Sequence, residues 1–386
     1  MTSRERVLAA INHQQPDRLP IDFGSTTVTG ITAVAYSHLR RHLGIDSGSI
    51  GIVDPFQLLA EVERPILELL GADVVGIFLS GGKLHGWQDW TLSDGTTVRM
   101  PADVELQQRD DGGWNMSRQG KREATMPSEG FYLDALEYPQ WRTYDPEALT
   151  RQILEELKDQ ARYWHNESDY AIVLNAPFAL FNGTSPEFLC ALLLEKDEVH
   201  ERLETWADGI ISGVLQLLEA VGDFCDVIAF SGDLGTQKAP LISADLYREM
   251  ILPHFRRVPQ FIHEHSRLKV FYHSCGSVYE LIDSLIEMGI DILNPLQVSA
   301  AGMEPERLVR EFGGQIVFWG GGCDTQRILP QGTDQQVRLE VANRLDAYTA
   351  VPGYVFTPVH NIQPDVPPAN IVAMYDEARR HVLKRS

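Results

Sequence analysis

The stretch Lys269-Val-Phe-Tyr-His273-Ser-Cys275 is a short apolar run that ends in two residue types able to bind metals. Its length and its apolar content predict a β-strand. Because side chains alternate along a strand, His273 and Cys275 are expected to point to the same side. An imidazole beside a thiol suits a borderline-soft metal ion, zinc above all. The stretch therefore predicts a strand whose end binds a metal.

Seven further apolar runs of strand length occur along the chain, separated by helical stretches. They are Arg18–Gly24, Ala72–Phe78, Ala171–Phe178, Asp226–Asp233, Asp291–Gln297, Ile316–Gly322 and Tyr354–His360. Helices are predicted, among other places, over Pro186–Val221, Ser243–His265, Ser277–Met288, Thr333–Thr349 and Pro367–Lys384. Near-continuous apolarity is typical of parallel strands that are covered on both sides. Eight alternations of strand and helix predict the α/β class and a (β/α)8 TIM barrel with N-terminal helices, formed by residues 1–386 as a single domain.

A doubly wound open sheet is the alternative architecture. It requires a glycine fingerprint after the first strand, and this sequence has none there.

One region interrupts the alternation after the second strand. Residues 86–127 carry Trp87, Trp90 and Trp114 together with turn signals such as Asp94-Gly95. Alternating stretches flank these turns, so the region is predicted to be an insertion of β-hairpins. Two interpretations stay open: the insertion covers the barrel mouth, or it decorates the surface.

Composition excludes several classes of function. The 386 residues carry a net charge of -21, which argues against nucleic acid and anionic membranes as partners. No apolar run approaches the ~18 residues needed to span a bilayer, and the start lacks the apolar centre of a signal peptide, so we expect a cytoplasmic protein. Only four cysteines occur, which argues against a disulfide framework. Of these, Cys190 and Cys225 are predicted to be buried thiols.

Polar side chains gather at the predicted carboxyl ends of the strands, where barrels of this kind hold their active sites. The candidates are Asn175, Asp233, His273, Cys275, Asn294, Gln297, Cys323, His360 and Asn361. Each also has a structural interpretation, since a strand-end His is often only hydrogen-bonded and Asp or Asn often stabilise turns. The coincidence of His-x-Cys, a glycine-flanked Cys and another His at three strand ends favours a metal site. A ligand set dispersed over several segments is typical of a catalytic metal.

Several motifs together resemble the uroporphyrinogen decarboxylase superfamily, over nearly the whole chain. They are Asp17-Arg18-Leu-Pro20, Asn175-Ala-Pro-Phe178, Ser231-Gly232-Asp233-Leu-Gly235, His273-Ser-Cys275-Gly276 and Pro364-Asp-Val-Pro-Pro-Ala-Asn370-Ile371. The chain is most similar to the corrinoid-dependent (cobalamin) methyltransferase branch, which includes methylcobalamin:coenzyme M methyltransferases. The resemblance implies a (β/α)8 barrel.

In that branch the His-x-Cys-Gly motif supplies two zinc ligands, here His273 and Cys275, and a cysteine after strand 8 supplies a third. This chain departs from the pattern, because His360 stands at the third position. Cys323 is the competing candidate and ranks slightly ahead, because a second thiolate adds affinity and the glycines before it allow close approach. The family position favours His360 instead.

The resemblance implies a zinc-dependent methyltransferase that moves a methyl group between a methoxy, methylamine or thiol compound and the cobalt of a corrinoid. A separate corrinoid protein would be the partner, because the sequence lacks an Asp-x-His-x-x-Gly cobalamin motif. Asp233 is the expected catalytic residue, as proton acceptor or hydrogen-bond partner of the bound group. Asn175, Asn294, Gln297 and Asn361 are expected to contact the substrate. The superfamily also allows a homodimer.

The alternative is a metal-free decarboxylase or lyase of the same superfamily. Decarboxylases carry an arginine-containing loop after strand 1, whereas here that loop reads Asp22-Phe-Gly-Ser-Thr-Thr-Val-Thr29. Without arginines to hold porphyrinogen carboxylates, this reaction is disfavoured.

Overall fold

A computed structural model describes residues 1–45, 48–79, 81–92, 94–118, 120–128, 130, 133–135, 148–181 and 185–383. Ser80 and Lys384, which belong to predicted segments, lie outside these residues. Within the described ranges, no helix is both long and apolar enough to cross a membrane.

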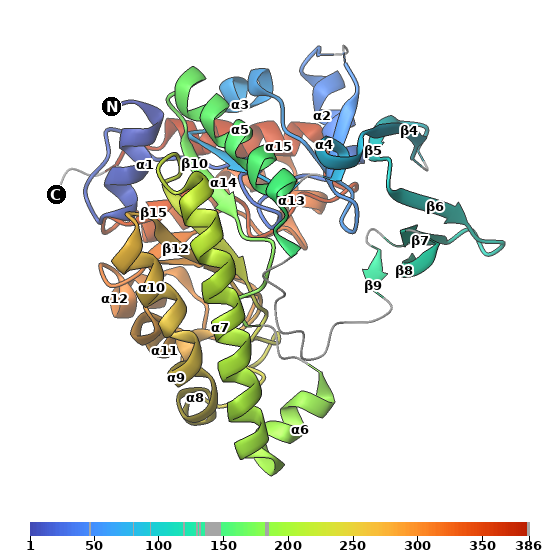
Figure 1. Cartoon of the computed structure of the whole chain (residues 1–386). Coiled ribbons are helices and arrows are strands. Elements are labelled where there is room, and N and C mark those ends of the chain that lie inside the picture. The colour runs from blue at the N-terminus through green and yellow to red at the C-terminus, as the bar shows by residue number, and fades with distance from the viewer. Residues whose placement is uncertain are drawn as a thin grey trace.

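A curled parallel sheet of seven strands forms the centre of the molecule (Figure 1). Its strands are β3 (Val74–Ile77), β10 (Ala171–Asn175), β11 (Val227–Ser231), β12 (Lys269–His273), β13 (Ile292–Asn294), β14 (Val317–Trp319) and β15 (Tyr354–Val355). They pair in chain order from β3 to β15. Each predicted strand after the first is confirmed, although the strands are shorter than the apolar runs that predicted them.

The eighth strand position is occupied by an irregular segment around Ile21. Ile21 makes a parallel bridge to Phe356 beyond β15, and its carbonyl accepts the N–H of Asp73 just before β3. The segment thus connects both edges of the sheet and closes the barrel. The prediction of a regular strand over Arg18–Gly24 is wrong, because Pro20 has no N–H to donate and the Ile21 N–H donates to the Asp73 side chain instead of to a strand.

Helices surround the sheet and follow its strands. They are α1 (Ser3–Ile11), α2 (Ala33–His42), α3 (Arg64–Leu70), α4 (Gly81–His85), α5 (Arg151–Glu167), α6 (Pro186–Leu194), α7 (Lys196–Val221), α8 (Ala244–Leu246), α9 (Leu252–Phe255), α10 (Arg257–His265), α11 (Ile282–Met288), α12 (Pro305–Phe312), α13 (Ile328–Gln331), α14 (Asp334–Tyr348) and α15 (Pro368–Arg380).

Two long helices of the sequence prediction are broken. The helix predicted over Pro186–Val221 is split at Glu195, whose φ of -130° and ψ of 43° are not helical. The helix predicted over Ser243–His265 contains a π-helical turn at Tyr247–Ile251. Pro253 follows that turn, and its missing N–H explains why the regular hydrogen-bond pattern is not kept there.

The barrel interior is apolar below its mouth. Val74, Val227 and Trp319 point inward from their strands, and Val7 and Ile11 of α1 belong to the same cluster. The first helix therefore seals the amino-terminal end of the barrel. Chemistry is left to the other end.

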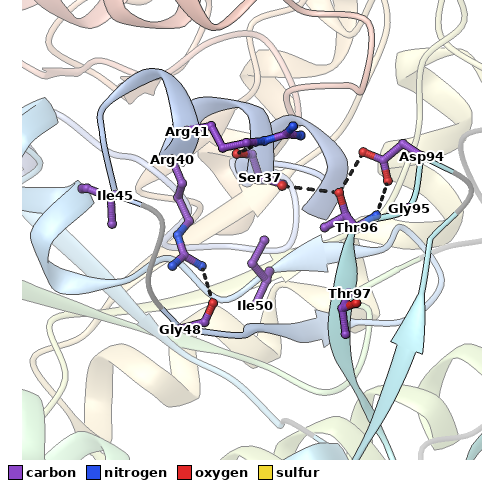
Figure 2. Close-up of a pocket in the computed structure, with 10 residues that line it drawn as sticks. All are labelled: Ser37, Arg40, Arg41, Ile45, Gly48, Ile50, Asp94, Gly95, Thr96 and Thr97. Carbon is purple, nitrogen blue, oxygen red and sulfur yellow. Dashed lines mark hydrogen bonds between the residues drawn. The ribbon is translucent and has the colours of Figure 1, made fainter.

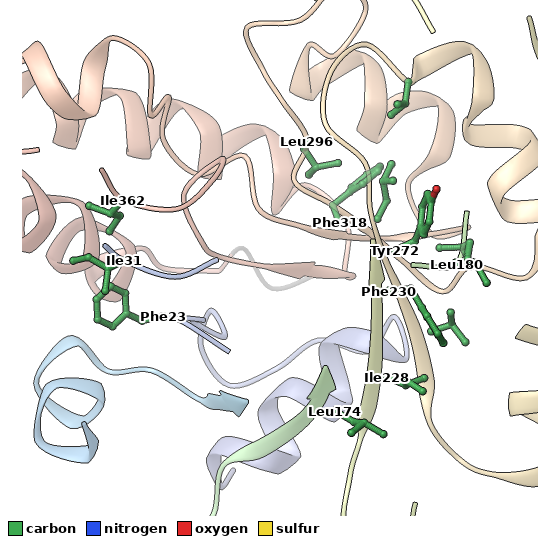
Figure 3. Packing of buried hydrophobic residues seen from close by; sticks show 14 of the residues in the cluster. Phe23, Ile31, Leu174, Leu180, Ile228, Phe230, Tyr272, Leu296, Phe318 and Ile362 are labelled. Carbon is green, nitrogen blue, oxygen red and sulfur yellow. The ribbon is translucent and has the colours of Figure 1, made fainter. Parts of the chain in front are cut away.

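The outward-facing strand residues form a second and larger core beneath the helices. Ile228, Phe230, Tyr272 and Phe318 belong to it, and all are buried (Figure 3). Because inward and outward residues alternate along each strand, the same register that buries Tyr272 outward turns His273 inward. Core packing thus fixes the direction of the first metal-ligand candidate.

The inserted hairpins are present and belong to two small antiparallel arrangements. β4 (Trp87–Thr91) pairs with β5 (Thr97–Pro101), and β5 also pairs with β1 (Ile50–Asp54), which itself pairs with β2 (Leu59–Ala60). β6 (Val104–Gln108), β7 (Trp114–Arg118), β8 (Lys121–Met126) and β9 (Asp134–Ala135) form the other sheet. The rings of Trp90 and Trp114 meet edge to face at 5.0 Å and join the two (Figure 1).

A buried carboxylate fixes the start of the chain to the barrel. Asp73 is fully buried and accepts hydrogen bonds from Arg6 at 2.6 Å and from Arg18 at 2.7 and 2.8 Å. It also accepts the Ser3 hydroxyl at 2.7 Å and the Ile21 N–H at 3.0 Å. One side chain therefore holds both α1 and the irregular eighth strand position.

Asp73→Ala should lower the free energy of unfolding by about 3 kcal/mol, because it leaves the Arg6 guanidinium buried without its main partner. Denaturant unfolding measures the change. Glu68→Ala, which removes an exposed pair with Arg64, is the control and should leave the unfolding midpoint unchanged. An equal, small effect of both substitutions would contradict the role assigned to Asp73.

Candidate metal centre

Three side chains that could hold a metal ion converge at the carboxyl end of the barrel. They are His273, Cys275 and His360, whose ligand atoms lie within 4.8 Å of one another. His273 ends β12, Cys275 follows two residues later, and His360 comes from the loop after β15. The Cys275 Sγ lies 3.2 Å from His273 Nε2, and the two imidazole rings meet edge to face at 5.4 Å.

This geometry fits a zinc ion. Zn–N and Zn–S bonds of about 2.0 to 2.3 Å in a tetrahedron place donor atoms roughly 3.3 to 3.6 Å apart. The three donors are already within or near that range, so small side-chain rotations would complete the arrangement. One thiol and two imidazoles are also donors that zinc prefers.

Cys323 does not join the other candidates. Its thiol is fully buried in the hydrophobic core, and the charges that act on it belong to Glu340, Asp324 and Arg344 rather than to the triad. Burial raises the pKa of this thiol well above its usual value. The ranking of Cys323 ahead of His360 is not supported by the geometry, which favours His360 at the third position.

The glycines before Cys323 have packing roles. A Cβ at Gly320 would lie 2.4 Å from the Pro295 carbonyl oxygen, and one at Gly322 would lie 2.3 Å from the Phe356 ring. These positions are small because neighbouring segments cross them. The approach of a ligand or metal does not account for them.

Close backbone packing brings Asp233 beside Cys275. A Cβ at Gly276 would lie 2.5 Å from the Gly235 carbonyl carbon, and Gly276 has a φ of +87° that other residues rarely adopt. With no side chain at either glycine, the loops after β11 and β12 touch. The Asp233 Oδ1 then accepts the Cys275 N–H at 2.9 Å and lies 3.9 Å from His273 Nε2.

A buried amide sets the tautomer of His273. Asn294 is fully buried and donates from Nδ2 to the Trp319 carbonyl at 2.8 Å, which fixes the orientation of its amide. Its Oδ1 therefore faces His273 Nδ1 at 2.5 Å and must accept a proton from it. The other ring nitrogen, Nε2, keeps its lone pair and faces Cys275, as a metal ligand requires.

The electrostatics favour neutral imidazoles at this site. Burial lowers the pKa of His273, against the opposing effects of Asp233 and Asn294. Burial and the neighbouring His273 lower the pKa of His360 to about 3. Burial, with a contribution from Asp233, raises the pKa of the Cys275 thiol above its usual value. A metal ion bound here would displace the thiol proton and find both imidazoles ready.

The amides expected to contact substrate mostly support the backbone instead. Asn294 and Asn361 are fully buried, and Asn361 binds the Gly30 N–H, the Thr27 carbonyl and Gln57. Their prediction as substrate contacts is wrong, because all their polar atoms face protein groups. Asn175 likewise donates to the Ser25 and Ile77 carbonyls.

Gln297 also positions the site rather than a substrate. Its Oε1 accepts the Gly276 N–H at 2.8 Å and so holds the loop that carries Cys275. Asp233 remains in the expected place, with 57% of its side chain exposed at the mouth.

Two supporting residues were not foreseen from the sequence. Ser274, between the two ligand candidates, accepts the Leu234 N–H at 2.9 Å through its hydroxyl. Asp22 is buried inside the barrel and accepts the Trp319 indole N–H at 2.9 Å, while burial raises its pKa. The position of Asp22 at the end of an apolar run was the available signal. The remaining cysteines divide: Cys225 is buried as expected, but Cys190 is exposed and that prediction is wrong.

A cavity of about 320 Å³ lies apart from the candidate ligands, between α2 and the β4–β5 turn (Figure 2). Thr96 donates its hydroxyl to Ser37 at 3.3 Å and to Asp94 at 2.8 Å, and Arg40 donates to the Gly48 carbonyl at 3.3 Å. None of the predicted site residues lines it. Its polar groups connect the hairpin to α2.

Fold and site together define a (β/α)8 barrel with a three-donor metal-binding arrangement at its mouth. The family model of uroporphyrinogen decarboxylase (URO-D) matches residues 174–381, more than half of the chain. The chain therefore belongs to the uroporphyrinogen decarboxylase family, and the resemblance drawn from its motifs is confirmed.

Two individual proteins are similar to the chain. Uroporphyrinogen decarboxylase of Chlorobium phaeobacteroides is 24% identical over 216 residues, which cover 54% of this chain and 57% of that protein. The chain thus matches a little over half the length of this curated relative. A methyltransferase from Methanosarcina mazei has the same fold, with a TM-score of 0.61 and 16% identity over 98% of both chains.

Cys275→Ala should abolish metal binding, and His360→Ala should weaken it by about 100-fold or more, because each removes a direct donor. Elemental analysis and competition with a chromogenic chelator measure stoichiometry and affinity. Cys323→Ala is the matched control, since it removes a thiol from the core and should keep full metal content. Loss of metal from the Cys323 variant, with retention in the His360 variant, would reverse the ligand assignment.

Asn294→Ala should weaken zinc binding by about 10- to 100-fold in a protein that remains folded, because His273 loses the acceptor that fixes its tautomer. Asn361→Ala provides the control: it removes an equally buried asparagine that does not touch the triad. Circular dichroism verifies the fold of each variant before the affinity titration. Equal affinities for both variants would rule out a specific role for Asn294.

Proposed function

We propose that this protein is a zinc-dependent methyltransferase that moves a methyl group between a small-molecule substrate and the cobalt of a corrinoid. The observation that carries the proposal is the convergence of His273, Cys275 and His360 at the mouth of the barrel. Among the described residues this group has three members, which would leave one tetrahedral position for substrate. Such an incomplete protein ligand set is typical of catalytic zinc.

Zinc at this site would supply Lewis acidity, which favours the anionic form of a bound thiol or a better leaving group from a methyl donor. The protein's own residues prepare the site for that ion. Asn294 orients His273, and Gln297 holds the loop of Cys275. Their hydrogen bonds keep the donors in place before metal arrives, which limits reorganisation on binding.

Asp233 is the proposed catalytic group. Its Oδ1 is engaged by the Cys275 N–H, while more than half of its side chain remains open to the mouth. A carboxylate in this place can accept a proton from an entering thiol or hydroxyl. It can also hold a hydroxyl of the substrate by a hydrogen bond.

The corrinoid is proposed to come on a separate protein, because the sequence has no Asp-x-His-x-x-Gly motif. Such a partner must reach the mouth where the triad lies. A cytoplasmic location and a homodimer are further proposals, made from sequence and family resemblance.

Decarboxylation is the second candidate, since both the family and the curated relative carry the name of uroporphyrinogen decarboxylase. A metal-free decarboxylase of this kind would use Asp233 on a carboxylated substrate. The site supports it less well: the loop from Asp22 to Thr29 has no arginine, and the triad has no role in such a reaction.

Zinc analysis followed by methyl-transfer assays tests the proposal. We expect about one zinc per chain and transfer from methoxy or methylamine compounds to cob(I)alamin, or from methylcobalamin to thiols. Purified protein that binds no zinc, and that releases carbon dioxide from a porphyrinogen, would favour the decarboxylase instead.

Asp233→Asn should lower the rate of methyl transfer by about 100-fold while zinc content stays at the wild-type level. Asparagine keeps an oxygen to accept the Cys275 N–H but cannot accept a proton at neutral pH. Stopped-flow assays with free corrinoid, together with elemental analysis, measure both quantities. A wild-type rate would mean that Asp233 is structural, and loss of zinc would mean that it is a ligand.

A further inference from the structure

We propose that this site demethylates a neutral methoxy compound, with oxygen as the leaving atom, and that it is not built to methylate a thiol. This inference rests on the proposed function and names its substrate class. Its basis is the ligand set that the structure brings together, two imidazoles and a single thiol.

The first step of the argument is the charge of the donors. Metal-binding histidines are neutral and metal-binding cysteines are thiolates. With His273, Cys275 and His360 as ligands, a divalent zinc site keeps one net positive charge. A site with cysteine in place of His360 would be neutral. The exclusion of Cys323 from the triad therefore decides the charge of the centre.

The second step connects this charge to reactivity. A thiol acceptor must remain nucleophilic while it is held, which an electron-rich set with more thiolates favours. An ether must instead lose its oxygen as an anion, which a more positive centre favours by Lewis acidity. A methylated ammonium leaves as a neutral amine and gains least from such a centre. One thiolate and two imidazoles therefore favour the methoxy donor.

The surroundings of the triad point the same way. The charged side chain whose field acts on His273, Cys275 and His360 is Asp233; no lysine or arginine of the described chain contributes. An anionic substrate would thus meet a carboxylate and find no cation there. Asp233 is half exposed and screened by water, so it does not cancel the effect of the ligand set.

The transfer balances with the corrinoid that the proposed function already requires. The bond between methyl carbon and oxygen breaks, and its electron pair stays on oxygen. Cobalt(I) supplies the pair for the new cobalt–carbon bond and becomes methyl-cobalt(III). The oxygen anion then takes a proton from water and leaves as a phenol or alcohol.

The test compares the wild-type protein with His360→Cys, which changes the charge of the donor set and little else. Both proteins are loaded with Co²⁺, and thiol binding is titrated with 2-mercaptoethanol by the visible absorption of the metal. We expect the variant to bind this thiol about tenfold more tightly than the wild type, relative to phenol. The spectrum also reports the number of thiolate ligands, independently of activity.

Zinc-loaded wild type is then assayed with methoxyphenol and methanol against cob(I)alamin, and with 2-mercaptoethanol against methylcobalamin. We expect demethylation to exceed thiol methylation by about tenfold or more, and His360→Cys to reduce that ratio. If the variant fails to fold, the wild-type ratio alone decides.

The outcomes separate the two proposals. A wild-type protein that binds no metal overturns the proposed function and this inference together. Metal binding with thiol methylation equal to or faster than demethylation, or with activity on methylamines alone, overturns the inference and leaves the methyltransferase standing.

Discussion

The parallel register of β11, β12 and β13 is the constraint on which the candidate centre depends. It pairs Ser231 with His273 and His273 with Asn294, so that three inward-facing residues lie side by side at the carboxyl ends of the strands. A shift by one residue would turn His273 into the outer core and Tyr272 into the mouth. The outer core of large apolar side chains thus fixes the chemistry of the inner face.

Support for the donors comes from two kinds of contact. Asn294 links His273 to the Trp319 carbonyl, and Trp319 in turn donates its indole N–H to Asp22, so a polar chain crosses the top of the barrel. Gly235 and Gly276 allow two loops to touch, which brings Asp233 to Cys275. Removal of a donor and removal of its support are therefore different experiments on one site.

Much of the fold followed from local pattern. Apolar runs located seven strands, and His-x-Cys at the end of one of them correctly placed two ligand candidates on the same side. The irregular eighth position was missed because Pro20 and the Asp73 carboxylate replace regular strand hydrogen bonds, a tertiary effect that no local pattern contains. Breaks at Glu195 and before Pro253 were also set by context.

The site was harder to predict than the fold. Cys323 and His360 both end apolar runs, and only the three-dimensional structure shows that one thiol enters the core while the imidazole joins His273. Polar amides at strand ends looked like substrate contacts, yet Asn294 and Asn361 satisfy buried backbone and side-chain groups. Sequence position gave the right neighbourhood, and hydrogen bonding decided the role.

X-ray absorption at the zinc edge of the purified, zinc-loaded protein tests the central claim most directly. The account predicts one sulfur and two imidazole nitrogens from the protein for each zinc, at bond lengths of about 2.3 and 2.0 Å. A fourth, lighter ligand from solvent or substrate is compatible with it. Two sulfur ligands, or a metal bound without sulfur, would contradict it.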